Sequence, residues 1–253
     1  MIVSRAPLRV SLFGGGTDFH NYFKNKNSKI LTFTINKYIY VILKKRDDKL
    51  LYFNYSKKEI LNNLNQAKHE IIREVLKKFK IYSGIEISII SDIPSKGSGL
   101  GSSSALTNAL ILACSRYKKI KLSQKQIAQM AIDVEINKLK KPIGIQDQYG
   151  TSIGGVKIIE MYKNKISIKK VKNKKLINIL NNNTIIFDTR KNRKAEEVLI
   201  NQKRNITNNK EYLDKIRQIS HDFLINLSNL NIKDFIDKLN LSWSIKKKLD
   251  KKI

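Results

Sequence analysis

The sequence predicts an α+β protein, because strand-like and helix-like segments are both well marked along its 253 residues. A β-branched run at 85–93 predicts a strand, and the apolar residues of 105–117 recur at helical spacing. A loop rich in glycine and serine, residues 94–104, joins the two segments. Weak alternation of apolar residues at 2–13 predicts a further strand, and the apolar residues in the C-terminal part of the chain recur at helical spacing.

The loop at 94–104 is the strongest functional signal in the sequence. Gly97, Gly99 and Gly101 allow the backbone to approach a ligand closely. A helix start follows, and its unpaired N–H groups and positive dipole end suit a phosphate group. Ser102–Ser104 add hydroxyls that could cap the helix or bind a metal ion.

A plain flexible turn with Ser102 as the helix N-cap is the alternative to a phosphate loop. A Walker A loop is excluded, since no Gly-Lys-Ser/Thr stands at the required spacing, and the G-x-G-x-x-G dinucleotide pattern fails as well.

Composition and charge indicate a globular protein. Apolar residues make up 41% of the chain, and no run reaches the length of a membrane span or forms a signal peptide. The single cysteine, Cys114, cannot form an internal disulfide, so we expect a buried free thiol and a cytoplasmic location. The net charge of +29 suggests anionic partners, but the lysines are spread along the chain, which argues against specific nucleic-acid binding.

The N-terminal strand ends in a glycine-rich turn, Phe13-Gly-Gly-Gly-Thr-Asp18. Asp18 could accept hydrogen bonds from sugar hydroxyls, or Thr17 and Asp18 could cap a short helix through Tyr22 and Phe23. The next β-rich segments, 29–43 and 49–55, flank a predicted hairpin turn at 46–49, and residues 57–80 are predicted to be helical.

Two carboxylates stand out in the middle of the chain. Ser123 is a good N-cap for a helix to about Leu139, and Glu135 lies near the C-terminal end of that helix. A carboxylate there opposes the helix dipole, so Glu135 is either a solvated surface residue or a metal ligand. Asp147 lies between two glutamines in a glycine-rich stretch and by itself predicts only a turn.

The remaining elements follow from local patterns. Residues 155–172 predict a β-hairpin turning at Lys163-Asn164, and 184–189 predict another strand. Two basic amphipathic helices are expected near 210–227 and 231–250.

Three spaced motifs together resemble the GHMP kinases, the superfamily of galactokinase, homoserine kinase and mevalonate kinase. They are Arg5-Ala-Pro-Leu-Arg-Val-Ser-Leu-Phe-Gly-Gly-Gly-Thr-Asp18, Gly99-Leu-Gly-Ser-Ser-Ser-Ala105 and the stretch 141–155 with Gln146-Asp-Gln-Tyr149. The triple glycine before Thr-Asp and the Gln-Asp-Gln-Tyr form are similar to heptose 7-phosphate kinases, as is the segment 189–195. The resemblance spans residues 5 to about 247.

This resemblance implies a two-domain GHMP kinase fold. Residues 1–180 would form an ATP-binding domain like ribosomal protein S5 domain 2, and 181–253 would form part of a ferredoxin-like domain. The superfamily's third glycine-rich motif is missing, since no glycine follows Gly155. We therefore expect a C-terminally truncated chain that exposes apolar surface, is poorly soluble and is nearly inactive.

The activity implied by the resemblance is transfer of the ATP γ-phosphoryl group to a sugar hydroxyl, with Mg²⁺ as the metal. Asp147 would orient or deprotonate the acceptor hydroxyl, and Arg9 would supply a positive charge beside it. Ser103 and Glu135 would hold Mg²⁺. Nucleotide binding would fall to Gly97, Ser98, Gly99, Leu100, Gly101, Ser102 and Ser103, and substrate binding to Gly15, Gly16, Thr17, Asp18 and Arg193.

The expected substrate is D-glycero-D-manno-heptose 7-phosphate, phosphorylated at its C1 hydroxyl for nucleotide-heptose synthesis. The alternatives are a 1-kinase for an unphosphorylated sugar such as fucose, a GHMP-like fold without catalysis, and a basic RNA-binding protein. The expected partners are ATP and a sugar phosphate, with neither a specific nucleic acid nor a membrane.

Overall fold

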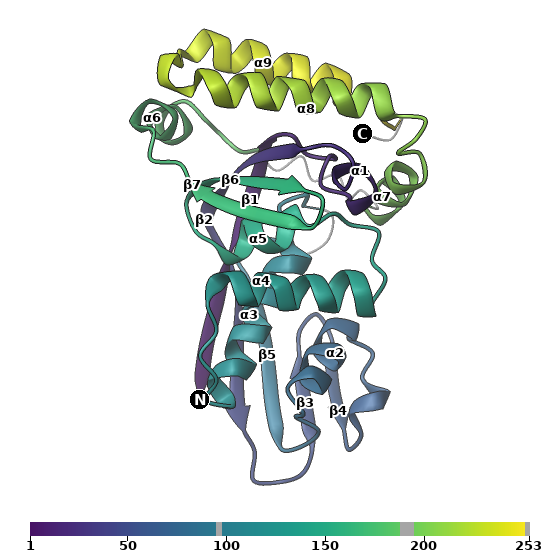
Figure 1. Cartoon of the computed structure of the whole chain (residues 1–253). Coiled ribbons are helices and arrows are strands. Elements are labelled where there is room, and N and C mark those ends of the chain that lie inside the picture. Colours follow the sequence, from purple (N-terminus) through teal and green to yellow (C-terminus); the bar gives the residue numbers. More distant parts are fainter. Residues whose placement is uncertain (95–97, 188–194, 251–253) are drawn as a thin grey trace. The chain divides into compact units, whose positions relative to one another are not determined.

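The computed structural model describes residues 1–94, 98–187 and 195–250 (Figure 1). It divides into two compact units, which are described separately below. The first unit comprises Met1–Leu8, Ile35–Lys141 and Asp147–Ile153; the second comprises Arg9–Thr34, Pro142–Gln146 and Gly154–Ile253. The predicted strands at the N-terminus are confirmed as β1 (Ile2–Phe13) and β2 (Ser28–Lys45), and both are long enough to contribute residues to each unit.

The sheet of the first unit has the strand order β4-β3-β5-β2. Strand β5 (Ile85–Ser91) lies between β2 and β3 (Leu51–Asn54), antiparallel to β2 and parallel to β3. The predicted hairpin turn between the segments that became β2 and β3 is therefore wrong. The chain instead crosses over through α2 (Glu70–Lys78) and returns as β5, which pairs with both strands.

The prediction of a helix over 57–80 is only partly confirmed. Its second half contains α2, but its first half forms the edge strand β4 (Lys58–Leu61) and a 3₁₀ turn, η1 (Leu64–Gln66). Strand β4 pairs with β3 over four residues, and this partner is what overrides the local helical pattern.

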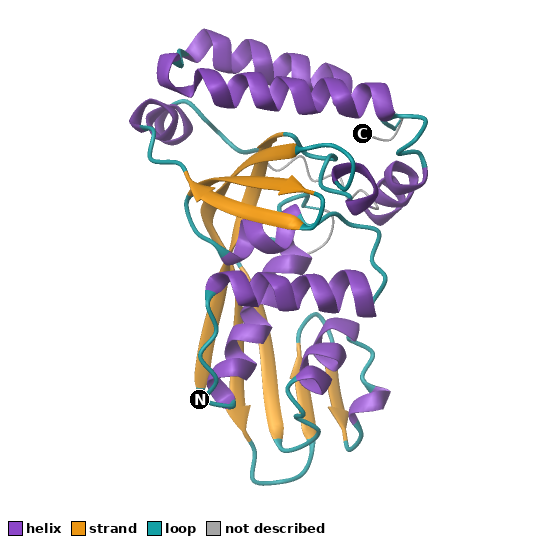
Figure 2. Ribbon diagram, in the orientation of Figure 1, coloured by secondary structure: helices purple, strands orange, loops and turns teal. Residues whose placement is uncertain are grey.

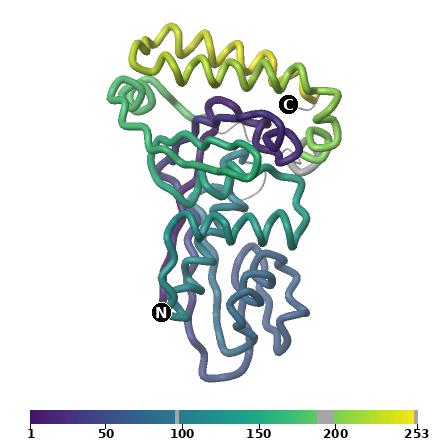
Figure 3. The backbone as a smooth tube through the Cα atoms, in the orientation of Figure 1, coloured from purple at the N-terminus to yellow at the C-terminus, as the bar shows by residue number. Residues whose placement is uncertain are grey.

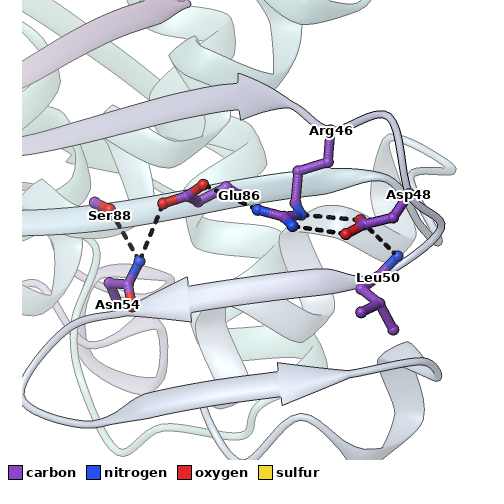
Figure 4. Close-up of polar contacts among 6 residues, drawn as sticks. All are labelled: Arg46, Asp48, Leu50, Asn54, Glu86 and Ser88. Atoms are coloured by element: carbon purple, nitrogen blue, oxygen red, sulfur yellow. Dashed lines mark hydrogen bonds and ion pairs between the residues drawn. The ribbon is translucent and has the colours of Figure 1, made fainter.

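Arg46 closes the connection that leads from β2 towards β3 (Figure 4). Its guanidinium binds both carboxylate oxygens of Asp48, at 2.9 and 2.6 Å, and donates to Glu86 at 3.3 Å. It also stacks on the Tyr52 ring, with Cζ 3.7 Å from the centroid. These contacts join the loop to strands β3 and β5, and the guanidinium lowers the pKa of Asp48.

Two helices bury one face of this sheet. The buried residues of β2 alternate with partly exposed ones, and they pack against α2 and against α3 (Ser102–Tyr117), the predicted helix after the glycine-rich loop. Cys114 of α3 is a buried free thiol, as predicted, and burial raises its pKa to about 12. A thiol with so high a pKa is unreactive at neutral pH.

The helix predicted from Ser123 to Leu139 is confirmed in position, but only its first part is α-helical. Ser123 and Gln126 form a complete capping box at the start of α4 (Gln124–Ile132). The helix then widens into a π-helical segment, η2 (Asp133–Lys138), that contains Glu135. The amide of Leu139 donates to the Val134 carbonyl, five residues back.

The second unit combines a hairpin with helices. Strands β6 (Val156–Tyr162) and β7 (Lys165–Lys170) form the predicted hairpin, and β6 pairs with the N-terminal half of β2 (Figure 2). The remaining elements are α1 (His20–Phe23), α5 (Gln146–Ser152, which begins in this unit), α6 (Lys174–Asn182), α7 (Ala195–Arg204), α8 (Lys210–Ile225), η3 (Asn226–Asn229) and α9 (Ile232–Lys246).

Helices α8 and α9 confirm the two predicted basic helices and run side by side (Figure 3). The strand predicted at 184–189 is wrong for residues 184–187, which have no regular structure, and its last two residues lie outside the described part. No described helix is long and apolar enough to cross a membrane. The domain boundary near residue 180 stays a prediction.

Three aromatic rings anchor α8 and α9 to β1. Phe13 at the end of β1 stacks on Phe223, with ring centroids 4.4 Å apart, and meets Phe235 edge-on at 6.2 Å. Phe13 and Phe223 are almost fully buried, so the three rings form the centre of the second unit's apolar core.

We expect Phe223→Ala to lower the free energy of unfolding by about 3–5 kcal/mol, because it removes a buried ring and leaves a cavity. Ile225→Ala on the same helix is the matched control, since Ile225 is 63% exposed and its truncation should change the free energy by less than about 0.5 kcal/mol. Urea denaturation of both variants measures the difference. Equal losses would show that the aromatic cluster is not the core of this unit.

Candidate active site

The predicted site residues divide between the two units. Gly97 and Arg193 lie outside the described residues. The others are Ser98–Ser103, Glu135 and Asp147 in the first unit, and Arg9 and Gly15–Asp18 in the second.

The glycine-rich loop enters α3 through two left-handed glycines, Gly99 at φ 68° and Gly101 at φ 76°. Gly101 is the N-cap residue, and no side chain caps this helix, so the alternative that Ser102 is the N-cap is wrong. Gly101 has a left-handed backbone at this N-cap position, and glycine adopts that conformation at little cost. Ser98 stabilises the loop through two contacts. Its hydroxyl lies 2.9 Å from that of Ser102 and accepts a hydrogen bond from the Leu100 amide at 3.3 Å.

Glu135 is fully buried, and its carboxylate accepts hydrogen bonds from three side chains. Ser103 Oγ donates to Oε1 at 2.6 Å, Ser104 Oγ to Oε2 at 2.6 Å, and Gln148 Nε2 to Oε2 at 2.9 Å. The alternative of a solvated surface carboxylate is therefore wrong. The first turn of α3, the π-helical segment η2 and helix α5 meet at this one carboxylate.

Lys141 completes this cluster and was not foreseen from the sequence. Its Nζ donates to Ser103 Oγ at 2.7 Å and lies 3.5 Å from Glu135 Oε1. The backbone amide of Lys141 also donates to the Glu135 carbonyl at 2.9 Å. A positive charge is thus already held beside Ser103 and Glu135, the two residues predicted to bind a metal ion.

The donor chemistry of this pair suits Mg²⁺, which prefers hard oxygen ligands and few protein ligands. Ser103 Oγ and Glu135 Oε1 are a hydroxyl and a carboxylate oxygen 2.6 Å apart. Among the described residues, no group of three or more His, Cys, Asp or Glu side chains could hold a metal ion. An ion held by Ser103 and Glu135 would therefore need water or nucleotide oxygens as further ligands.

Asp147 lies in the first turn of the short helix α5, so the expectation of a simple turn is wrong. Asn108 of α3 fixes this helix, because its Nδ2 donates to the Gln148 carbonyl at 2.9 Å and to Thr151 Oγ1 at 2.8 Å. Thr151 Oγ1 in turn donates to the Asp147 carbonyl at 2.8 Å. The sequence analysis did not identify the role of Asn108, although a single amide side chain in a mostly apolar helical stretch could have indicated it.

In the second unit the triple glycine forms a tight turn. Gly14 and Gly16 have φ of 83° and 99°, and Thr17 donates through both N and Oγ1 to the Gly14 carbonyl. Neither Thr17 nor Asp18 caps the short helix α1, whose N-cap position is Phe19 with no capping side chain. The capping alternative is therefore wrong.

Asp18 instead binds the segment that precedes Asp147. Its carboxylate accepts from the Gly16 amide at 3.1 Å, and from the Gln146 amide and side chain at 3.2 and 3.3 Å. Ser11 Oγ donates to Gln146 Oε1 at 2.8 Å. A Cβ on Gly144 would overlap the Asp18 carboxylate, so this close packing depends on glycine at 144.

Among the described residues of the second unit, two cationic side chains are buried. Arg9 on β1 is 7% exposed, and Lys157 on β6 is fully buried. Burial, and then the positive charges of Lys170 and Arg9, lower the pKa of Lys157 to about 7. The sequence analysis missed Lys157, which occupies an inward position of the alternating strand together with Ile159 and Met161.

We expect Lys157→Met to stabilise the protein in a pH-dependent way. The pKa of Lys157 falls from an ordinary value of 10.5 to about 7 on folding, so its burial costs stability in full below pH 7. The cost declines as the pH rises from 7 to 10.5. At roughly 1.4 kcal/mol per pKa unit, the variant should gain a few kcal/mol at pH 7 and little at pH 10.

Urea denaturation at both pH values measures this gain, and Lys165→Met, at an exposed position of β7, is the matched control. A gain that is the same at the two pH values would mean that Lys157 does not lose its proton on folding.

Comparisons with known proteins agree on one superfamily. Residues 65–155 match the family model described as the GHMP kinases N terminal domain. The chain is 30% identical, over 97% of its length and 77% of the relative's, to the D-glycero-alpha-D-manno-heptose 7-phosphate kinase of Campylobacter jejuni. It is 31% identical to the mevalonate kinase of Pyrococcus abyssi, but over 61% of this chain and only half of that kinase.

The fold is that of solved GHMP-type kinases. A D-glycero-D-manno-heptose 1-phosphate kinase from Bacteroides thetaiotaomicron superposes with a TM-score of 0.81 at 23% identity, covering 98% of this chain and 80% of that one. At this identity the match shows the fold alone. It confirms the predicted α+β kinase fold with a mixed sheet, whereas the expected subdivision into S5-like and ferredoxin-like domains stays a prediction.

Proposed function

Because the chain belongs to the GHMP kinase superfamily, we propose that it transfers the γ-phosphoryl group of ATP to a hydroxyl group of a sugar. The proposed acceptor is the C1 hydroxyl of D-glycero-D-manno-heptose 7-phosphate. The observation that carries this choice is the 30% identity over 97% of the chain to a heptose 7-phosphate kinase. The triple glycine before Thr17-Asp18 and the Gln146-Asp147-Gln148 form support it.

The nucleotide would bind to the first unit, at the loop that leads into α3. The loop contains two left-handed glycines, Gly99 and Gly101, and no side chain caps the start of α3. Such a helix start attracts the phosphates of a nucleotide through its dipole and unpaired amides. The proposed nucleotide-binding residues are Gly97–Ser103, of which Ser98–Ser103 are described.

Ser103 and Glu135, both in the first unit, are the proposed Mg²⁺ ligands. Their two oxygens are close, and Glu135 is fixed by bonds from Ser104 and Gln148. A bound Mg²⁺ ion would neutralise negative charge on the phosphate oxygens.

The sugar is proposed to bind to the second unit, at the turn from Gly15 to Asp18. Hydrogen bonds from Gly16 and Gln146 fix the orientation of the Asp18 carboxylate, which is proposed to accept hydrogen bonds from sugar hydroxyls. Arg193 is proposed to bind the substrate phosphate, because a guanidinium can bind a phosphate in a bidentate fork.

The proposed chemistry is an in-line displacement. The acceptor oxygen forms a bond to the γ-phosphorus, its proton passes to Asp147, and the bond between the γ-phosphorus and the β–γ bridging oxygen breaks to release ADP. The positive charge of Arg9 is proposed to stabilise the transferring phosphoryl group. This chain's residues thus orient the reactants and balance their charge, as phosphoryl transfer requires.

A coupled assay for ADP release, run with a panel of acceptors, tests the proposal. We expect turnover with heptose 7-phosphate and none with fucose, mevalonate or the unphosphorylated heptose. Turnover with fucose but not with the heptose phosphate would indicate an unphosphorylated sugar as the substrate. The absence of both ATP binding and turnover with any acceptor would contradict the kinase proposal.

We expect Asp147→Asn to lower kcat by about 10²–10⁴-fold while ATP binding is retained, because the variant loses the group that orients and accepts the proton of the acceptor hydroxyl. Steady-state kinetics give kcat, and fluorescence titration with an ATP analogue gives the Kd. Asp47→Asn is the control, since Asp47 is an exposed loop residue and its charge change is the same. Unchanged turnover in the Asp147 variant would remove this residue from the catalytic role.

A further inference from the structure

The backbone conformation next to Lys141 positions its side chain against the proposed metal ligands, Ser103 and Glu135. The backbone amide of Lys141 is bonded to the Glu135 carbonyl, and Lys140 before it has a left-handed backbone with φ of 54°. This turn brings the Lys141 side chain back to Ser103, to which Nζ donates at 2.7 Å. The side chain remains 23% exposed, so it has a route out to solvent.

The positive charge of Lys141 compensates the buried negative charge of Glu135. The three hydrogen bonds from Ser103, Ser104 and Gln148 satisfy the buried carboxylate as an acceptor, but they bring no positive charge. The Lys141 ammonium lies 3.5 Å from Glu135 Oε1 and supplies that positive charge.

We propose that Lys141 is the resident cation of this site in the nucleotide-free protein, and that it must leave before a divalent ion can bind Ser103 and Glu135. This inference rests on the proposed function, from which the metal and the nucleotide follow. Both cations use the same hydroxyl and the same carboxylate oxygen, and a like charge at this distance opposes the second cation. Lys141 is a positioning residue in this scheme.

The consequence is that metal loading becomes dependent on the nucleotide. A free divalent ion must displace the ammonium and leave it nearby without a new partner. An ion that arrives with a nucleotide brings phosphate oxygens, which can accept the hydrogen bonds of the displaced ammonium. The flexible four-carbon stem of lysine allows this movement. Lys141 would therefore weaken the binding of free metal and strengthen the binding of the metal–nucleotide complex.

The test compares two affinities in the wild type and in Lys141→Met, with Mn²⁺ as the probe. Electron paramagnetic resonance counts unbound Mn²⁺, first with the ion alone and then with a non-hydrolysable ATP analogue. Lys141→Met should bind Mn²⁺ alone roughly tenfold or more tightly than the wild type, because a neighbouring like charge is removed. The same variant should bind the Mn²⁺–nucleotide complex several-fold more weakly. A merely structural role would not produce opposite changes.

Two controls accompany this comparison. Lys138→Met removes an equal charge from an exposed position of η2 and should leave both affinities unchanged. Lys141→Arg keeps the charge and should retain the weak binding of free Mn²⁺. Circular dichroism checks that each variant is folded, and Lys141→Gln replaces the Met variant if that one is not.

A second readout is thermal stability, since Mn²⁺ alone should raise the unfolding temperature of Lys141→Met more than that of the wild type. The inference is overturned if the neutral variant binds free Mn²⁺ no more tightly than the wild type. Failure of the wild type to bind the Mn²⁺–nucleotide complex would contradict the proposed function instead, and the comparison with Mn²⁺ alone would still decide the role of Lys141.

Discussion

The burial of the Glu135 carboxylate is the constraint on which the site of the first unit depends. A carboxylate removed from water must be compensated by hydrogen bonds and positive charge, and here three elements supply them. Ser103 and Ser104 fix the first turn of α3, Gln148 fixes α5, and Lys141 fixes the end of the π-helical segment. The proposed phosphate loop, the proposed metal ligands and the helix of Asp147 are thus positioned by one buried charge.

In the second unit, close backbone packing positions another buried carboxylate, that of Asp18. The triple glycine turn is held by Thr17, and the Asp18 carboxylate accepts a hydrogen bond from the Gln146 amide. The glycine at 144 allows the carboxylate to approach this closely. The second unit also buries two cationic side chains, Arg9 and Lys157, among its described residues. Such a composition is costly for stability and suits the recognition of an anionic substrate.

Local sequence patterns were sufficient for much of this arrangement. The N-cap at Ser123 was correctly located, as were the hairpin turning at Lys163 and the buried thiol of Cys114. The left-handed glycines of the proposed phosphate loop follow from the same logic, because glycine adopts a positive φ more readily than other residues. In each case the deciding interaction lies within a few residues, so the sequence itself determined the outcome.

Contacts between distant residues decided the rest. Strand β5 inserts between β2 and β3, and β4 becomes a strand rather than a helix, because pairing partners outweigh local preference. Asp18 binds Gln146 instead of capping a helix, and Lys141 reaches Ser103 after a left-handed turn at Lys140. The sequence determined the motifs, whereas only the tertiary structure decided which charges are buried together, because desolvation depends on everything that packs around a group.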